Sequence, residues 1–196
     1  MKYYYKKANN VKKMEPEKIQ ETWLPEQFAT SNTAKDIAYL TQDEKDAIMY
    51  INLARLYPTQ FISIEIENYT GPKETEFYLL GSKFKQSLID TMNTMKSCKA
   101  LDFDEELYES AKCFAIESGE KGIVGHERVK CAKSDYSECC AYGMQLGKDI
   151  AIQWLIDHGV EGVGHRHACL DKKFSKIGLS KHIHKTKKFC AVAEFN

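Results

Sequence analysis

Two pairs of histidines, each with one residue between its members, are candidates for metal chemistry. They are His165 with His167 and His182 with His184, and Cys169 lies close to the first pair. On a β-strand, residues two apart point to the same face, so each pair could present two imidazoles together. Imidazoles suit transition metals. A four-histidine metal site is therefore one hypothesis, and a solvated hairpin carrying chance histidines is the alternative.

A second candidate for chemistry is the pair Cys139 and Cys140, which directly follows Glu138. A thiol beside an acid and a histidine is the arrangement of an activated cysteine nucleophile. No protease signature surrounds these residues. Adjacent cysteines in a Cys-rich segment are more often disulfide-bonded, so we expect Cys139 and Cys140 to be in disulfides.

The cysteine content also indicates the redox state of the compartment in which the protein works. All seven lie in the second half of the chain: Cys98, Cys113, Cys131, Cys139, Cys140, Cys169 and Cys190. This density favours an oxidising compartment. The odd number leaves at least one thiol free or intermolecular, and we expect it to be Cys98 or Cys113; the pairing of the others stays open. The alternative is that buried free thiols act as small apolar residues.

Composition excludes several classes of protein. The 196 residues, 43% hydrophobic and 29% charged, fit one globular domain with a short extension. Basic and acidic residues balance at 28 each, so no global field attracts nucleic acid or an anionic membrane. No apolar stretch approaches the ~20 residues of a transmembrane helix. The first residues lack the apolar middle of a signal peptide, so with these cysteines we expect a secreted, cell-surface or periplasmic protein whose signal was removed.

The elements that must position these residues follow from capping and periodicity. Residues 1–39 are polar and aperiodic and predict a partly ordered N-terminal extension, followed by a domain over 40–196. Thr41 and Glu44 have capping-box spacing, so a helix starts there, and Pro58 stops it. Further helices are expected over 74–95, from 103 or 105 to 119 or 122, and over 148–158, with an irregular stretch to about 146 before the last.

The end of the chain has a different period. Apolar residues alternate over 176–183 and again over 189–195, which predicts a C-terminal β-hairpin. Helices followed by a hairpin predict an α+β domain in which helices pack on an antiparallel sheet.

Five segments, in this order, resemble the CAP superfamily (cysteine-rich secretory, antigen 5 and pathogenesis-related proteins; the SCP domain), in a bacterial-type branch. They are 51–58, similar to the opening "IN-x-AR-x-x-P" helix; 107–128, ending in a "GHE" turn; 137–143, similar to the "GEN" loop; 154–166, ending in "GHR"; and 174–178, similar to "F-x-x-IG". Together with the hairpin, the resemblance covers residues 41–196.

The resemblance implies an α-β-α sandwich: a central antiparallel sheet with helices on both faces. It also implies a cleft with two histidines and two acidic residues, which in some members bind a divalent metal through the histidines. Members are mostly secreted, and the roles proposed for them range from lipid binding to immune modulation and occasional proteolysis. The fold alone does not give the function.

The cleft residues implied by the resemblance can be placed one by one. Glu138 matches the acid of the "GEN" loop, and His165 matches the "GH" histidine. Asp157 lies where many members carry a glutamate, and it is one methylene shorter. Phe114 falls where the first cleft histidine is usual, and a phenyl ring cannot bind a metal. The "GHE" histidine, His126, is the substitute to consider.

The differences from the CAP pattern at Asp157 and Phe114 determine which function we expect. We expect an extracellular, non-catalytic protein whose degenerate cleft binds a small apolar ligand, a peptide or a surface polymer, and a divalent metal is disfavoured by Phe114. The alternatives are a metal- or Cys-dependent hydrolase and a structural or interaction protein with a vestigial cleft.

Overall fold

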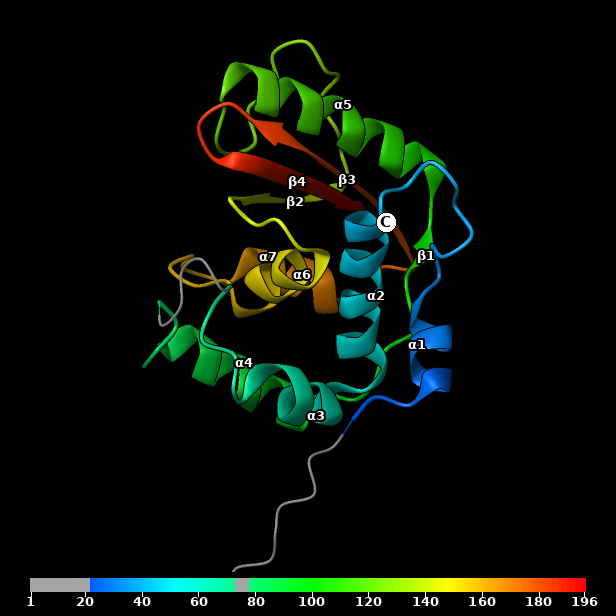
Figure 1. Ribbon diagram of the computed structural model, residues 1–196, viewed down its shortest axis with the longest axis vertical. Helices are drawn as coiled ribbons and strands as arrows, with labels where there is room; N and C mark the ends of the chain where they lie inside the picture. The colour runs from blue at the N-terminus through cyan, green and yellow to red at the C-terminus, as the bar shows by residue number, and fades with distance from the viewer. Residues whose placement is uncertain (1–21, 73–77) are drawn as a thin grey trace, which may run out of the picture.

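A four-stranded sheet forms the centre of the fold in the computed structural model, which describes residues 22–72 and 78–196 (Figure 1). The strands are β1 (Asp102–Phe103), β2 (Ser137–Tyr142), β3 (Lys176–His184) and β4 (Lys188–Phe195), in the order β1-β3-β4-β2. β3 and β4 form the expected hairpin, and β2 runs antiparallel to β4. The two-residue β1 is parallel to β3. Strand β2 lies in the stretch that the sequence predicted to be irregular.

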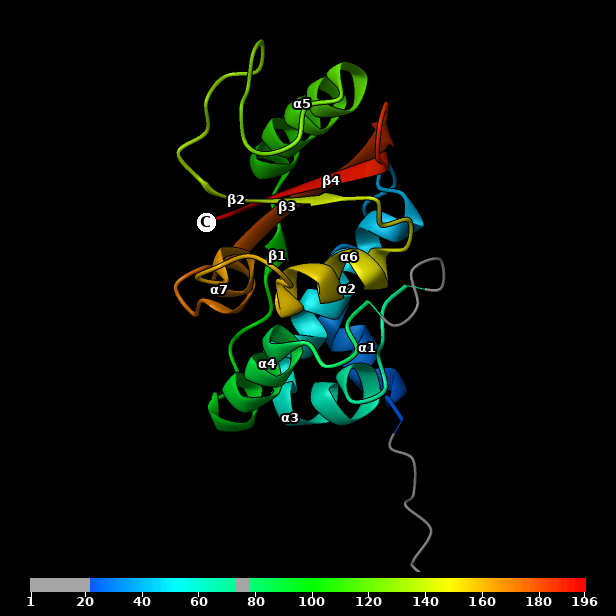
Figure 2. The same cartoon turned by 90° about the vertical axis from the view of Figure 1, so that its left-hand side faces the viewer.

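Helices cover both faces of this sheet (Figures 1 and 2). One face carries α5 (Glu105–Lys121), and the other carries α2 (Gln42–Leu56), α6 (Gly147–Ile156) and α7 (Gly164–Leu170). Beyond these lie α1 (Pro25–Ser31), α3 (Pro58–Phe61), the π-helix η1 (Ile62–Ile66) and α4 (Lys83–Thr94). The predicted α+β class, with an α-β-α arrangement and a C-terminal hairpin, is confirmed, but the sheet is mixed and not wholly antiparallel, because β1 pairs with β3 in parallel.

Local capping explains where the helices begin and end. The Thr41 side chain accepts a hydrogen bond from the backbone N–H of Glu44, and the Glu44 side chain bonds back, so the predicted capping box is confirmed. Asp104 caps α5, and Gly122 ends it with a left-handed backbone. The helix expected over 74–95 begins only at Lys83, and residues 73–77 lie outside the described residues.

One expectation about the later helices was wrong, and one helix was missed. Helix α6 ends at Asp157, which has a left-handed backbone (φ 56°), and not at Gly159. Helix α7 begins with the "GHR" residues and was not expected. It is short, at 7 residues, and has no long apolar repeat that a sequence could reveal.

Residues 22–39 of the expected extension pack against the core. Trp23 and Phe28 contact the main hydrophobic cluster. Asn52, fully buried in α2, donates to the carbonyl oxygens of Ser31 and Leu101 at 3.0 Å each and accepts from the N–H of Leu101 at 2.7 Å. One amide side chain therefore joins three segments, which gives a physical reason for the asparagine of the "IN-x-AR" motif. Residues 1–21 lie outside the described residues.

Two buried arginines hold the turns around the helices. Arg55 is fully buried and donates to four backbone carbonyls, those of Lys99, Cys169, Asp171 and Phe174, at 2.8–3.0 Å. Arg166 of the "GHR" element donates to the carbonyls of Phe84, Leu155 and Ile156 and to the Ser87 hydroxyl. Both guanidinium groups thus donate mainly to backbone carbonyls, and they tie separate helices and turns together.

Glycine allows α5 to lie directly on the hairpin. A Cβ on Gly178 of β3 would collide with the backbone of Leu107 and Tyr108, and a Cβ on Gly119 of α5 would collide with the carbonyl of Ile183. The glycine of the "IG" motif is therefore required by the close approach of helix and strand.

The cysteine pairing differs from the expectation. Cys113 and Cys131 form a disulfide that links α5 to the segment before β2, so Cys113 is not the odd cysteine. The other five cysteines are free, including Cys139 and Cys140, which were expected in disulfides. Both belong to strand β2, where they are buried and pack as small apolar residues. None of the helices in residues 22–72 and 78–196 has the length and hydrophobicity that a bilayer-crossing segment needs.

Candidate ligand-binding cleft

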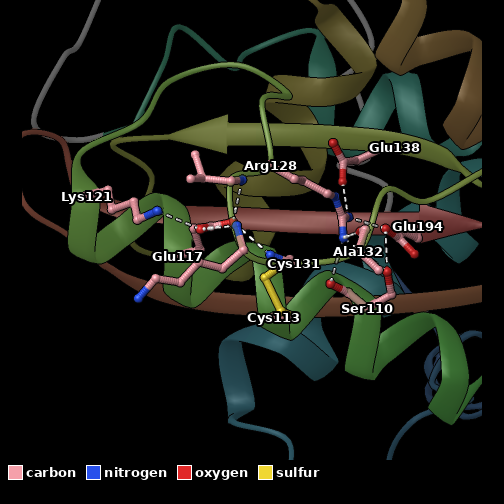
Figure 3. Close-up of a disulfide and its surroundings, with 11 residues drawn as sticks. Ser110, Cys113, Glu117, Lys121, Arg128, Cys131, Ala132, Glu138 and Glu194 are labelled. Atoms are coloured by element: carbon pink, nitrogen blue, oxygen red, sulfur yellow. Dashed lines mark hydrogen bonds and ion pairs between the residues drawn. A yellow bond between two sulfur atoms is a disulfide. The ribbon is translucent and has the colours of Figure 1, made fainter.

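The segment 122–136, between α5 and β2, carries part of the candidate site and is fixed to α5 (Figure 3). The Cys113–Cys131 disulfide is one attachment. The carboxylate of Glu117 is a second, because it accepts the backbone N–H groups of Val129, Lys130 and Cys131 at 2.9, 2.7 and 3.2 Å. A hydrogen bond from Lys121 and these three N–H groups lower the pKa of Glu117 to about 2.

His126 of this segment pairs with Glu138 of β2. Its Nδ1 lies 2.8 Å from Glu138 Oε1. Because a carboxylate only accepts, Nδ1 carries the hydrogen, and no described residue bonds Nε2. The hydrogen bond to Glu138 raises the pKa of His126. Burial pushes the pKa of Glu138 up, but hydrogen bonds from His126 and Arg128 outweigh it, and the pKa lies below its ordinary value.

Arg128 connects two carboxylates on neighbouring strands (Figure 3). Its guanidinium makes ion pairs with Glu138 of β2 and with Glu194, the residue opposite Glu138 on β4. It also bonds the hydroxyl of Ser110 at 3.2 Å. Glu194 is fully buried, and burial raises its pKa although Arg128 acts in the other direction. The Arg128 side chain thereby fixes the orientation of Glu138.

Phe114 lies beneath this network. Its ring is fully buried, and the guanidinium carbon of Arg128 stands 4.9 Å from the ring centroid. Phe114 packs with Ala111, Ala115 and Val192 and lines neither of the hollows beside His126. It is a packing residue, and His126 is the imidazole that the structure places at the cleft.

The second imidazole of the cleft is held by the left-handed end of α6. Asp157 accepts the backbone N–H of His165 at 2.9 Å, and its other oxygen lies 2.7 Å from His165 Nδ1. The aspartate is long enough because its backbone turns back toward α7. His165 therefore also has its Nδ1 on a carboxylate, and its Nε2 has no partner among the described residues.

The two imidazoles lie near each other. The ring centroids of His126 and His165 are 6.3 Å apart, with an angle of 28° between the planes. Both rings line a hollow of about 250 Å³. Its other walls come from β2, α6 and the flanking loops: Val124, Gly125, Cys140, Tyr142, Gln153, Trp154, Asp157, His158 and Val160. The structure thus brings together His126, Glu138, Asp157 and His165, the four polar residues considered from the resemblance.

A second hollow, of about 490 Å³, also borders His126. It is bounded by the charged residues Glu127, Arg128, Lys133 and Glu138 and by Cys131 and Ser134. Because both His126 and Glu138 border this hollow, a molecule inside it could contact the His126–Glu138 pair.

The free thiols beside the cleft are not activated nucleophiles. Cys140 Sγ lies 3.6 Å from His126 Nδ1 and 3.8 Å from Glu138 Oε1. Burial and the Glu138 charge raise the pKa of Cys140, and burial and Cys169 raise that of Cys139. Both thiols are therefore protonated at neutral pH, which speaks against a cysteine nucleophile.

The structure does not bring the four histidines of the two His-x-His pairs together. His165 and His167 lie on helix α7 instead of a strand, and helix residues two apart point in different directions. On β3, His184 is buried with its Nε2 2.9 Å from the carbonyl of Ile123. Within residues 22–72 and 78–196, the one group of three or more such side chains whose donor atoms could share an ion is His126, Glu138 and Cys140.

Sequence reasoning missed Arg128 and Glu194. One signal was present: Glu194 interrupts the apolar residues of the last strand, Ala191 to Phe195. A carboxylate on a buried strand needs a cationic or hydrogen-bonding partner. The sequence could not show that this partner comes from a segment more than sixty residues earlier.

No family model and no curated protein matches the chain. Among solved structures, an outer surface protein from Borrelia burgdorferi is similar, with a TM-score of 0.41 and 19% identity over 57% of this chain and 86% of that chain. A similarity of this size carries no argument about function.

Proposed function

We propose that this chain is a non-catalytic, exported binding protein of the CAP type, whose hollow between His126 and His165 holds a small ligand. The ligand has an apolar body and one anionic group. The five sequence segments support the CAP assignment, and the disulfide Cys113–Cys131 supports an oxidising compartment.

The observation that carries the proposal is the pairing of the two imidazoles across one hollow. Each Nδ1 is hydrogen-bonded to a carboxylate, so the orientation of each ring is fixed. The Nδ1 atoms are therefore occupied, and the Nε2 atoms are left for a ligand. The free Nε2 atoms can donate to an anionic group when the rings are protonated. Val124, Trp154 and Val160 supply apolar wall. A few fixed polar groups within apolar walls are typical of small-ligand sites.

The volume limits the ligand. About 250 Å³ lies just below the range of about 300 to 1,000 Å³ that is usual for ligand pockets. The hollow therefore takes a small molecule, or one end of a longer chain. Val124 and Val160 are partly exposed at 56% and 38%, so apolar surface continues to the outside of the hollow.

A hydrolase is the second candidate, and one observation favours it. The Asp157–His165 pair has the geometry of a histidine oriented by a carboxylate to act as a general base. Against it stands the chemistry around the pair: the Cys139 and Cys140 thiols are protonated, and Glu138 is engaged by His126 and Arg128. We therefore place binding first.

NMR titration of the oxidised, EDTA-treated protein with benzoate and hexanoate tests the proposal. We expect saturable shifts in the amide resonances of Val124, Val160 and His165. His126→Ala and His165→Ala should each weaken binding at least about tenfold, as expected for loss of a hydrogen bond to a charged group. His167→Ala, an exposed histidine on the same helix, is the matched control and should bind as the wild type does. Absence of these shifts, or equal binding by all three variants, would show that the hollow is not the site.

A further inference from the structure

Three donor atoms of different chemical types meet beside the hollow. His126 Nδ1 lies 2.8 Å from Glu138 Oε1, Cys140 Sγ lies 3.6 Å from that nitrogen, and the same sulfur lies 3.8 Å from the Glu138 oxygen. The three atoms therefore form a small triangle. Imidazole nitrogen, carboxylate oxygen and thiolate sulfur are the donors that zinc and related ions accept.

The triangle has nearly the size that a tetrahedral ion needs. Bonds of about 2.0 Å to nitrogen and oxygen and about 2.3 Å to sulfur place tetrahedral donors about 3.3–3.6 Å apart. The two distances to sulfur differ from these values by a few tenths of an ångström. The distance between His126 and Glu138 must open by about 0.5 Å, which replaces their mutual hydrogen bond with two bonds to the ion.

The fold holds the three donors in place without a metal. Glu138 and Cys140 are two apart on β2 and share one face of the strand. The Tyr142 hydroxyl, on the same face, bonds both the N–H and the carbonyl of Gly125 at 3.0 Å and so fixes the residue before His126. Arg128 binds the other oxygen of Glu138 and leaves Oε1 toward the triangle.

We propose that His126, Glu138 and Cys140 bind a thiophilic divalent ion such as zinc, with the fourth position taken by water or by the ligand of the hollow. That the ligand of the hollow can fill the fourth position rests on the proposed function; the assignment of the three protein ligands does not. Three protein ligands and one exchangeable position are the usual set of an open zinc site.

The two imidazoles alone make a weaker site. His126 and His165 would supply two ligands through Nε2, because Asp157 holds the other nitrogen of His165. The set with Cys140 has one more protein ligand and includes sulfur, which selects zinc, cadmium or cobalt over magnesium and calcium.

Binding changes the protonation of one group. The Cys140 thiol gives its proton to solvent as the sulfur–metal bond forms, and His126 stays neutral by binding through Nδ1 with its hydrogen on Nε2. The thiolate and the Glu138 carboxylate then neutralise the two charges of the ion. The nearby Arg128 charge is balanced by Glu194 on its other side.

Cobalt(II) titration of the full-length, disulfide-intact protein is the test, because cobalt replaces zinc and reports sulfur ligands by a charge-transfer absorption. The wild type should bind one ion with this absorption. Cys140→Ser and Cys140→Ala should both abolish the absorption and weaken binding at least tenfold. Cys98→Ser, which changes the most accessible free thiol, should leave both unchanged. His165→Ala should bind within about threefold of the wild type.

Two results would overturn the inference. One is the absence of cobalt binding to the wild type. The other is loss of binding in His165→Ala together with unchanged binding in the Cys140 variants, since the ion would then lie between the two histidines. The titration with benzoate in EDTA is independent of metal, so carboxylate binding without cobalt binding would refute this inference alone, and the reverse would refute the proposed ligand alone.

Discussion

Asp157 binds His165 twice, through the backbone N–H at 2.9 Å and through the ring Nδ1 at 2.7 Å. The same aspartate ends α6 with a left-handed backbone. One residue therefore sets both the direction in which the chain leaves the helix and the orientation of a cleft histidine. The two roles can be separated, because the first depends on the backbone and the second on the carboxylate.

Replacing Asp157 by glycine or alanine separates these roles. Both variants lose the carboxylate, so both should bind carboxylate ligands more weakly than the wild type. Glycine accepts a left-handed backbone and alanine does not, so Asp157→Ala should be less stable than Asp157→Gly by about 1 kcal/mol. Urea unfolding gives the stability difference, and NMR titration gives the affinity. Equal stability of the two variants would mean that the backbone at residue 157 carries no strain.

The disulfide should stabilise both the domain and the cleft. It closes a loop with a sequence separation of 18, for which loss of the cross-link costs about 3 kcal/mol. The loop contains His126 and Arg128, so the double variant Cys113→Ala/Cys131→Ala should unfold at lower urea concentration and show broadened amide resonances at His126. A double variant with unchanged resonances there would show that Glu117 and Tyr142 are enough to hold the segment.

Thiol counting gives a direct check of the pairing. The denatured, unreduced protein should show five thiols and the reduced protein seven. In the native protein Cys98 should react first, because it is half-buried and the other four free cysteines are buried. A count of one thiol would instead support the dense disulfide framework that the sequence suggested.

The fold was more predictable from sequence than the site. The capping box at Thr41, the cap at Gly122 and the alternating pattern after residue 176 each depend on neighbouring residues, so the sequence contains the whole signal. Strand β2 was missed because Ser137–Tyr142 is half polar and its pairing partner β4 lies fifty residues away. Helix α7 was missed because its 7 residues, about two turns, offer little periodicity.

The arrangement of the site depends on contacts between residues that are far apart in the sequence. The carboxylates of Glu138 and Asp157 and the imidazole of His165 were all named from the sequence. Phe114 was placed at the cleft by its position in a motif, but the side chain points into the layer between α5 and the sheet. The pairing of Cys113 with Cys131 depends on the path of residues 122–130, which no local pattern specifies.

The low pKa of Glu117 predicts a loss of stability in acid. A carboxyl whose pKa is about 2 in the folded protein and about 4.3 when unfolded stabilises the fold above pH 4.3, and that contribution disappears as the pH falls toward 2. Glu117→Gln has no charge to lose. The wild type should therefore be more stable than Glu117→Gln near pH 6, and the difference should shrink near pH 2.

Urea unfolding of both proteins at the two pH values measures this effect. Glu120→Gln, an exposed glutamate on the same helix, is the matched control and should alter the unfolding free energy little at either pH. A difference between wild type and Glu117→Gln that does not change with pH would mean that the charge of Glu117 does not hold residues 129–131.

Arg55 should be among the residues on which the fold depends most. Its guanidinium joins α2 to the turns at residues 99, 169, 171 and 174 through four carbonyls, and the side chain is fully buried. Arg55→Ala removes these four hydrogen bonds and opens a cavity, so it should destabilise the protein by about 3 kcal/mol or more. Arg55→Lys should recover only part of this loss, because an ammonium group on a shorter side chain cannot reach four carbonyls in a plane.

Lys99→Ala is the control: its exposed side chain is removed while its carbonyl still accepts from Arg55. Urea midpoints in the order wild type and Lys99→Ala, then Arg55→Lys, then Arg55→Ala are expected. A lysine variant as stable as the wild type would show that the positive charge, and not the planar set of donors, holds these turns together.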